Sequence, residues 1–357
     1  MADLFKKMLG HNESLFLDYL PLDPEFVPPV IQFRENEQGY VANCLKPLFD
    51  KRPGKNVFVT GSPGIGKTVA VKELLNQLEK ETSEIYGLYI NCWKKDSPHK
   101  IILEICDQLG YKFVQNRTTD ELIKEVSKII NKKAAAIVFD EADKVEDYSI
   151  LYSLLEDLYP KSIILITNEK DFLKSLDKRI NSRLLPDIIE FKKYNFDETY
   201  EILKKRVEYA FAENVFDNIA FDLIARKTFE IGDLRTGLFL LKEAGEIAEG
   251  KASRKVIIEH AENALNKLKE FKIRSSDSLE ENENEILEII KKNTGKATSE
   301  LYEKYKKDGG EKTYRTFLRR IQDLKKARVI STEETTWEGP GKITKVHYGS
   351  IKKLSDF

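Results

Sequence analysis

Five short β-branched, apolar runs alternate with longer helical patterns between residues 56 and 191, and this alternation constrains the fold most strongly. The runs are NVFVT (56–60), IYGLYIN (85–91), AAAIVFD (134–140), SIILIT (162–167) and DIIEF (187–191). Three of them are almost continuously apolar, which is typical of strands covered on both faces of a parallel sheet. Helical patterns lie between them at 67–80, 99–109, 119–132 and 148–158. The alternation predicts a doubly wound α/β domain.

The strand pattern ends at about residue 196, and a helical pattern replaces it. Residues 197–213, 217–229, 233–249 and 255–271 have the spacing of amphipathic helices, separated by Asn, Asp and Gly. They predict a small helical domain. The next segment, RSSDSLEENENE (274–285), is polar and poor in apolar residues, which is typical of a linker or an exposed junction.

Residues 285–357 have a pattern of their own, with three helical stretches followed by two β-rich stretches. The turn Gly339-Pro340-Gly341 lies between the β-rich stretches and predicts a hairpin. Three helices and a hairpin are the outline of a winged helix-turn-helix. We therefore expect an α/β base at 1–195, a helical lid at 196–273, a linker at 274–284 and a winged-helix domain at 285–357.

Composition excludes several other classes. With 41% apolar and 33% charged residues, the chain has enough apolar surface for real cores and a strongly charged exterior. No apolar run approaches the roughly 20 residues that span a bilayer, and charges interrupt the amino terminus, so we expect a cytoplasmic protein with no membrane partner. The three cysteines and four histidines lack the spacing of a zinc site, so we expect reduced thiols and no metal site built by protein alone.

The segment GSPGIGKT (61–68) fits the phosphate-binding pattern G-x-x-x-x-G-K-[ST], and it lies between a predicted strand and a predicted helix. Glycines allow backbone N–H groups to surround phosphates, and the positive end of the helix dipole adds to the attraction. This placement disfavours a chance glycine-rich turn. We expect ATP or ADP with Mg²⁺, held by Pro63, Gly64, Ile65, Gly66, Lys67 and Thr68. Lys67 would reach the β- and γ-phosphates, and the Thr68 hydroxyl would ligate Mg²⁺.

Polar residues follow two of the predicted strands. Asp140 and Glu141 follow AAAIVFD, where Asp140 would hold Mg²⁺ through water and Glu141 would polarise the attacking water. The plainer interpretation is an acidic helix start. Asn168 follows SIILIT and could position that water; its alternative is a helix cap. Arg235 opens a helix of the second domain and could reach over a nucleotide clamped between base and lid, unless it is a solvated arginine.

Together these residues resemble the AAA+ ATPases, with GSPGIGKT as Walker A, VFDEAD as Walker B, Asn168 as sensor one and GDLR (232–235) as sensor two. More narrowly, nearly the whole chain resembles the archaeal origin-recognition replication initiators. The supporting segments are FVPPVIQFRENE (26–37), YINCWKKDSPHKIILEICDQLG (89–110), LDKRINSRL (176–184) and IGDLRTGLFLLKEAGEIAE (231–249).

The resemblance implies further residue roles. The segment 26–37 packs near the adenine in that family, which makes Val27 and Pro28 nucleotide contacts. Arg183 occupies the arginine-finger position, with Arg179 as the alternative, and would act on nucleotide in a neighbouring subunit. A small helical insertion of the ATPase domain that touches DNA would fall within about 111–121, with Lys112 and Arg117 as phosphate contacts.

The charge distribution agrees with a DNA-binding carboxyl-terminal domain. The net charge of the chain is −1, but residues 283–357 contain 17 Lys and Arg against 12 Asp and Glu, a surplus of +5. The best candidate for a recognition helix begins at Lys312, with Phe317, Leu318, Ile321 and Leu324 as its buried stripe. The DNA contacts that we expect are Lys312, Thr313, Arg315, Arg319, Arg320 and, beside the wing, Lys342. A protein-binding winged helix with a solvated basic face is the alternative.

The resemblance implies an ATP-dependent initiator that binds double-stranded origin DNA, hydrolyses ATP slowly as a switch, and recruits the replicative helicase (MCM), with paralogous initiators as further partners. One alternative is a signalling or defence ATPase of the AAA+ class whose winged helix contacts protein. A clamp-loader-like ATPase is disfavoured by the winged helix. A DNA-binding regulator with a vestigial nucleotide site is disfavoured by intact Lys67, Asp140 and Glu141.

Overall fold

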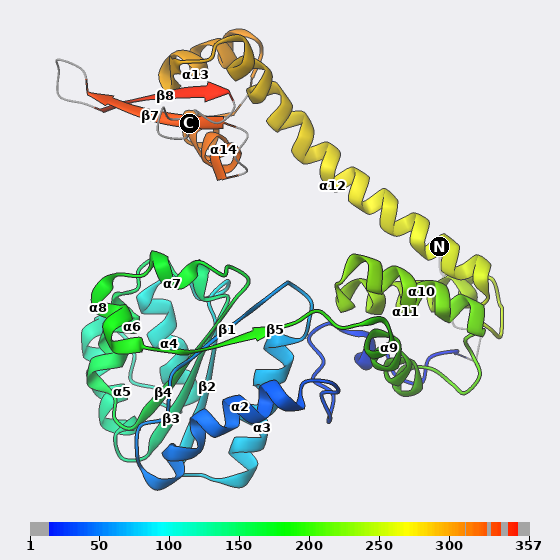
Figure 1. Cartoon of the computed structure of the whole chain (residues 1–357), viewed down its shortest axis with the longest axis horizontal. Coiled ribbons are helices and arrows are strands. Elements are labelled where there is room, and N and C mark those ends of the chain that lie inside the picture. The colour runs from blue at the N-terminus through cyan, green and yellow to red at the C-terminus, as the bar shows by residue number, and fades with distance from the viewer. Residues whose placement is uncertain (1–13, 311, 327–329, 337–341, 349–357) are drawn as a thin grey trace, which may run out of the picture. The chain divides into compact units, whose positions relative to one another are not determined.

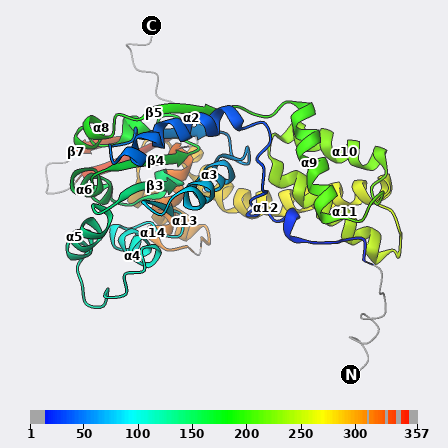
Figure 2. The ribbon, with the colours of Figure 1, turned by 90° about the horizontal axis from the view of Figure 1, so that it is seen from below.

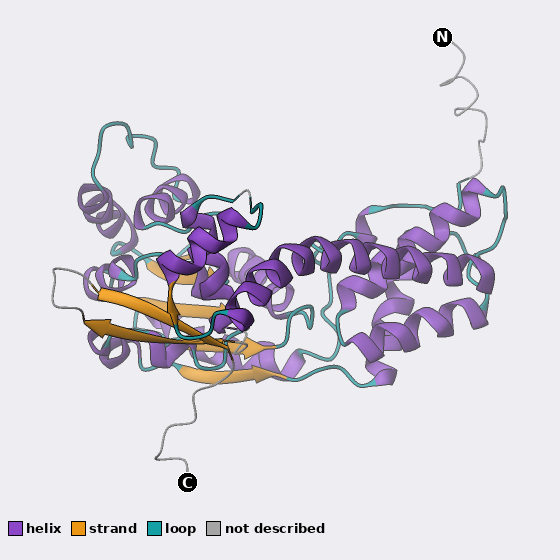
Figure 3. Cartoon of the chain, turned by 90° about the horizontal axis from the view of Figure 1, so that it is seen from above, coloured by secondary structure: helices purple, strands orange, loops and turns teal. Residues whose placement is uncertain are grey.

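The computed structural model describes residues 14–310, 312–326, 330–336 and 342–348 (Figure 1). The chain separates into two compact units, with the division between Leu265 and Asn266. Within the described residues the named strands form two sheets, and Figure 3 distinguishes strands from helices by colour. Among the described residues, no helix is both long enough and apolar enough to cross a membrane.

The first unit is built on a five-stranded sheet in which every neighbouring pair is parallel. Its strands are β1 (Val57–Gly61), β2 (Ile85–Asn91), β3 (Ala134–Asp140), β4 (Lys161–Thr167) and β5 (Asp187–Phe191), in the order β2-β3-β4-β1-β5. The five predicted strands are confirmed to within one residue. Because β1 lies between β4 and β5 and β4 pairs with β3, the carboxyl ends of β1, β3 and β4 meet at one edge.

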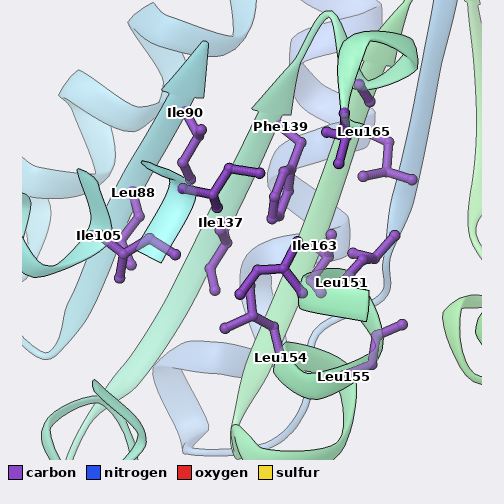
Figure 4. Close-up of a cluster of buried hydrophobic side chains, with 14 of the residues drawn as sticks. Leu88, Ile90, Ile105, Ile137, Phe139, Leu151, Leu154, Leu155, Ile163 and Leu165 are labelled. Atoms are coloured by element: carbon purple, nitrogen blue, oxygen red, sulfur yellow. The ribbon is translucent and has the colours of Figure 1, made fainter. Parts of the chain in front are cut away.

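Helices cover both faces of this sheet, as the doubly wound pattern requires. They are α2 (Glu35–Leu45), α3 (Lys67–Glu81), α4 (Pro98–Gln108), α5 (Thr119–Ile130), α6 (Ser149–Asp157), α7 (Phe172–Ser175) and α8 (Lys178–Leu184), with the 3₁₀ turns η2 (Lys46–Asp50) and η3 (Ala142–Lys144). The side chains of α2 and α3 share one core with Val138, whereas α4, α5, α6 and α8 share the other with Ile137 and Phe139 (Figure 4). This alternation along β3 buries it on both faces.

The connection from α4 to α5 corrects the expected helical insertion. Residues 111–118 contain no helix, and α5 begins only at Thr119. Thr118 forms a capping box with Glu121, which fixes the start of the helix at this position. Tyr111 and Val114 pack against the neighbouring core and so hold the segment as a surface loop.

The lid of the first unit is helical, as predicted. It contains α9 (Phe196–Ala210), α10 (Asn218–Ile231), α11 (Leu234–Gly250) and the start of α12 (Ile258–Lys292), and Figure 2 labels these four helices. The amino-terminal residues also belong to it. The backbone N–H of Leu17 donates to the Ala210 carbonyl at 2.8 Å, and the 3₁₀ turn η1 (Leu20–Leu22) packs on α9. The first described residues therefore pack on the lid rather than on the base, to which we had assigned them.

The second unit is a small winged helix. It contains the end of α12, β6 (Lys296–Ala297), α13 (Thr298–Lys307), α14 (Tyr314–Lys326), β7 (Ile330–Thr336) and β8 (Lys342–Tyr348), with the antiparallel strand order β6-β8-β7. Ile290, Leu301, Phe317 and Val346 lie in its core. The predicted turn Gly339-Pro340-Gly341 lies outside the described residues.

The predicted linker at 274–284 is helical in the structure, where α12 continues through it from Ile258 to Lys292. The reason lies in the sequence, because residues 258–292 contain neither glycine nor proline to interrupt the backbone pattern. A low apolar content does not by itself end a helix.

The core between the sheet and α6 can be tested by truncation. Leu154 is 0% exposed there, whereas Leu185 is 76% exposed at the end of α8. Leu154→Ala should lower the free energy of unfolding by about 2–5 kcal/mol, since it removes buried methyl groups and leaves a cavity. Urea denaturation of the full chain measures the change. Leu185→Ala is the matched control, and an equal loss in both variants would contradict the assigned core.

Candidate nucleotide-binding site

A cavity of about 620 Å³ lies in the first unit, at the carboxyl edge of the sheet and against the lid. It is lined by the glycine-rich loop (Pro63, Gly64, Gly66, Lys67, Thr68), by strand ends (Tyr89, Asn91, Asp140, Glu141, Asn168) and by lid residues (Ile202, Arg206, Leu234, Arg235, Leu238). Cavities of roughly 300–1,000 Å³ hold small-molecule ligands in proteins, so the size fits a nucleotide. The structure thus brings together most of the nucleotide contacts predicted from the sequence.

The glycine-rich loop has a backbone that other residues could not adopt. Gly61, Gly64 and Gly66 have φ angles of +150°, +70° and +87°. A Cβ atom on Gly61 would lie 2.5 Å from the carbonyl oxygen of Phe191, and one on Gly64 would lie 1.9 Å from Oδ1 of Asp233. The loop therefore fits between β5 and the lid only because these positions lack a side chain. It leads directly into α3, which begins at Lys67 and presents its positive end to the cavity.

Lys67 lies buried within this loop, and its ammonium group is fully engaged. Its Nζ donates to the carbonyl oxygens of Gly61 at 2.9 Å and Ser62 at 2.8 Å, and to Oδ1 of Asn168 at 2.7 Å. Burial lowers the pKa of Lys67 to about 8, although the carboxylates of Glu141 and Asp140 oppose the shift. Lys67 thus connects the loop to the end of β4.

Asp140 and Thr68, which we predicted to hold Mg²⁺, are in direct contact. The Thr68 hydroxyl donates to Oδ2 of Asp140 at 2.9 Å, and the hydroxyl of Tyr89 donates to the same oxygen at 2.6 Å. The backbone N–H of Glu141 donates to the other oxygen, Oδ1, at 3.0 Å. Burial, followed by the charge of Asp140 and the hydrogen bond to it, raises the pKa of Tyr89, so the phenol stays a donor. Tyr89 was not predicted, and its position in a strand gave no sign of this contact.

These oxygen donors suit Mg²⁺, which prefers hydroxyl, carboxylate and water oxygens together with substrate phosphates. No group of three or more His, Cys, Asp or Glu in the described parts of the chain could hold a metal by itself. The chemistry of Thr68 and Asp140 therefore fits a metal ion that arrives with a nucleotide and is completed by it.

Glu141 and Asn168 face each other across two strand ends. The amide Nδ2 of Asn168 lies 3.2 Å and 3.4 Å from the carboxylate oxygens of Glu141. Burial, together with the carboxylates of Asp140 and Asp143, raises the pKa of Glu141. Asn168 connects Glu141 to Lys67 and caps no helix, since α7 begins only at Phe172.

Arg235 lines the cavity from the lid and makes two contacts with Asp233. Its Nη2 lies 2.7 Å from Oδ2 of Asp233, and its Nε lies 3.0 Å from Oδ1. The backbone N–H of Leu234, between them, donates to the carbonyl oxygen of Gly64 at 3.1 Å. The start of α11 is therefore bound directly to the glycine-rich loop, which supports the predicted place of Arg235 over the nucleotide.

Only some residues of the segment 26–37 line the cavity. Pro28 lines the cavity, whereas Val27 packs against the core shared with α2 and α3 and does not line it. Ile65 is also buried in that core, so only its backbone is available near the cavity. Val30 and Ile31 line the cavity but were not predicted.

Arg34 joins the glycine-rich loop to the segment that follows β5. Its guanidinium is buried and donates to the carbonyl oxygens of Ile65 at 3.2 Å and Lys192 at 2.6 Å, and to the hydroxyl of Tyr194 at 3.0 Å. It also pairs with Glu37 at 2.8 Å. The pattern R-E-x-E in segment 26–37 contains Arg34 and Glu37, and it was the signal that could have revealed this role.

The remaining predicted residues of the first unit do not line the cavity. Arg183 pairs with Glu156 at 2.7 Å and lies over the ring of Tyr152, and neither Arg183 nor Arg179 lines the cavity. Nζ of Lys112 lies 3.2 Å from Oδ1 of Asp107, and Nη1 of Arg117 lies 3.9 Å from Oε1 of Glu125.

The residues predicted to contact DNA from the winged helix differ in exposure. Four of them are exposed, namely Lys312, Thr313, Arg315 and Arg319, whereas Arg320 is half-buried and Lys342 begins β8. Phe317, Ile321 and Leu324 are buried as predicted, while Leu318 is only partly buried.

Comparison with known proteins identifies the family. Residues 51–176 match the model of an AAA domain, and residues 200–266 match that of the Cdc6 AAA+ ATPase-type lid domain. An ORC1-type DNA replication protein of Desulfurococcus amylolyticus is 30% identical over 352 residues, covering 91% of this chain and 89% of that protein. The chain belongs to the ORC1-type DNA replication proteins.

Two further comparisons agree. ORC1-type DNA replication protein 1 of Sulfurisphaera tokodaii is 32% identical over 277 residues, covering 74% of this chain and 68% of that protein. The ORC1 protein of Aeropyrum pernix, solved in complex with DNA, has a TM-score of 0.71 and 25% identity, covering 96% of this chain and 95% of that one. The predicted resemblance and the AAA+ fold are thus confirmed. As a AAA+ ATPase of the ORC1 type, the chain binds ATP or ADP.

The buried ammonium of Lys67 predicts a pH dependence of nucleotide binding by this ORC1-type protein. A phosphate needs the charged form, and the pKa of Lys67 lies near 8 rather than at its ordinary value of 10.5. Affinity for ADP should therefore fall as the pH rises above 8, approaching about tenfold per pH unit, and binding there should take up a proton. Titration calorimetry at pH 7, 8 and 9, in buffers of different ionisation enthalpy, measures both effects.

Lys67→Arg provides the control, because its guanidinium stays charged over this whole range. The variant should bind ADP with a flat pH profile, whatever its absolute affinity. A flat profile in the wild type, or an equal slope in both proteins, would show that Lys67 does not titrate in this window.

Proposed function

We propose that this chain is a DNA replication initiator that binds double-stranded origin DNA and uses ATP as a switch. The observation that carries the proposal is the convergence of Lys67, Asp140, Asn168 and Arg235 on one cavity between base and lid, in a chain of the ORC1 type. A vestigial nucleotide site would have no reason to keep these four groups around one cavity, with Lys67 hydrogen-bonded to Asn168.

The chain's own residues support ATP hydrolysis. Bound Mg²⁺ would neutralise charge on the phosphates, and Thr68 and, through water, Asp140 would hold it. Glu141 would orient the attacking water, with Asn168 fixing its carboxylate. Arg235 is paired with Asp233 and Arg183 with Glu156, so each arginine must leave a carboxylate before it reaches a phosphoryl group. Each arginine would therefore change partner when a nucleotide binds, which is a response that a nucleotide switch could use.

The exposed basic side chains of α14 and the residues before it support DNA binding by the winged helix. Lys312, Thr313, Arg315 and Arg319 are exposed at or near the amino-terminal half of α14, which is the part of a recognition helix that meets base edges and phosphates. The proposal includes Arg320 and Lys342 as flanking contacts, and Lys112 and Arg117 as weaker contacts from the base. The relative from Aeropyrum pernix was solved with DNA bound.

The proposal extends to partners that bind the initiator at the origin. Arg183 lies on α8 outside the cavity, so it could complete a nucleotide site only in a neighbouring subunit, either a second copy or a paralogous initiator. Recruitment of the replicative helicase (MCM) is the step that a DNA-bound switch of this type would control. Such a protein would work on the nucleoid in the cytoplasm.

The DNA-binding face can be tested by removing two exposed charges. Arg315→Ala combined with Arg319→Ala should weaken binding to duplex DNA at least tenfold at low salt and reduce the slope of log K against log salt by about 2, since each removed phosphate contact lowers it by about 1. Fluorescence anisotropy across a salt series measures both quantities. Binding of ADP should be unchanged.

Lys124→Ala combined with Lys128→Ala is the charge-matched control, because both lysines are exposed on α5. This variant should bind DNA as the wild type does. An equal loss of DNA affinity in both double variants would show that binding depends only on the net charge of the protein. If the wild type did not bind DNA, the winged helix would instead be a module that contacts protein.

Genome-wide footprinting in the source cell tests the origin assignment. Peaks at replication origins support the initiator proposal, and peaks confined to promoters would contradict it.

A further inference from the structure

The alignment of Glu141 with Asn168 needs an explanation, because no backbone ladder holds these two residues together. β3 and β4 pair in parallel only as far as Asp140 and Ile166. Glu141 and Asn168 lie beyond this ladder, and their side chains are 3.2–3.4 Å apart. This contact joins the two side chains, but it does not fix the backbone of either turn. Another interaction must hold the two turns.

The turn at Glu141 also carries strain. Its φ and ψ angles are 52° and 47°, in the left-handed region that is unfavourable for a residue with a Cβ atom. Such a conformation persists where the surroundings over-determine it, and it often marks a functional turn. The backbone N–H of Lys144 donates to the Glu141 carbonyl at 2.9 Å, which closes the turn but does not link it to β4.

Asp143 and Thr167 supply that link. The hydroxyl of Thr167 donates to Oδ1 of Asp143 at 2.5 Å and accepts the backbone N–H of Glu169 at 3.0 Å. Asp143 lies two residues after Glu141, and Thr167 lies directly before Asn168. One hydroxyl therefore ties the strained turn of Glu141 to the backbone on both sides of Asn168. The second oxygen of Asp143 pairs with Lys144 at 2.5 Å, which holds the carboxylate in place.

We propose that Asp143 and Thr167 are a positioning pair, which aligns Glu141 with Asn168 for ATP hydrolysis without taking part in nucleotide affinity. This inference rests on the proposed ATPase function of the site. Both residues act through their neighbours, and the pair should affect the rate of hydrolysis while leaving the binding of ADP intact.

Thr60 offers an unusually close control. It is the register partner of Thr167 on the adjacent strand β1, and the two residues are 4% and 1% exposed. The Thr60 hydroxyl, unlike that of Thr167, has no hydrogen-bond partner in the described structure. Valine has nearly the shape of threonine without the hydroxyl, so Thr167→Val and Thr60→Val make the same chemical change at the same level of the sheet.

The experiment compares single-turnover ATP hydrolysis and ADP affinity in the full chain. Thr167→Val should lower the hydrolysis rate about tenfold, since a small displacement of a positioned water is costly, and should keep the dissociation constant for ADP within twofold. Thr167→Ser, which retains the hydroxyl, should hydrolyse ATP within twofold of the wild type, and so should Thr60→Val. The double variant Thr167→Val with Asp143→Ala should hydrolyse ATP less than twofold more slowly than Thr167→Val alone. Both changes remove the same hydrogen bond between Thr167 and Asp143, so their effects should not add.

A second readout does not depend on activity. The side-chain amide signals of Asn168 in the nitrogen–proton spectrum should shift in Thr167→Val, measured without nucleotide, and stay in place in Thr60→Val. An unchanged rate in Thr167→Val, an equal fall in Thr60→Val, or a parallel loss of ADP affinity would overturn the positioning role. Absence of hydrolysis in the wild type would instead overturn the proposed ATPase function, so the two failures are distinguishable.

Discussion

The buried ammonium of Lys67 is the interaction on which the rest of the site depends. A charged group in this position is costly unless hydrogen bonds compensate, and three oxygens do so here. Two of them are carbonyls of the glycine-rich loop, so the loop must curve around the lysine. The third belongs to Asn168, so the end of β4 must approach the loop. Because Asn168 also contacts Glu141, the position of one lysine propagates to the end of β3.

The lid is joined to the same loop by a backbone hydrogen bond and by a close steric approach. The N–H of Leu234 binds the carbonyl of Gly64, and Asp233 lies so close that any side chain at Gly64 would collide with it. A phosphate entering the loop would therefore compete with the Asp233 carboxylate for the same positive surroundings and for Arg235. This competition gives a physical route from the γ-phosphate to movement of α11, which is what a nucleotide switch requires.

Much of this architecture could be predicted from the sequence, because its signals are local. Each strand of the parallel sheet is a short apolar run, and the glycine-rich loop is contiguous. The contacts that were not predicted join residues far apart in the chain. Arg34 reaches Lys192, Tyr89 reaches Asp140, and Leu17 reaches Ala210, and no periodicity encodes such pairs. The polarity of residues 274–284 did not reveal that α12 runs through this predicted linker as a helix, although residues 258–292 contain no helix-breaking residue.

The central claim is that base and lid share one nucleotide site, in which Arg235 distinguishes ATP from ADP. The most direct test is to measure the dissociation constants of both nucleotides, with a non-hydrolysable ATP analogue, for the wild type and for Arg235→Ala. Loss of a charged hydrogen bond to the γ-phosphate should weaken the ATP analogue roughly tenfold and leave ADP nearly unchanged. Equal weakening of both nucleotides, or no weakening of either, would contradict the account.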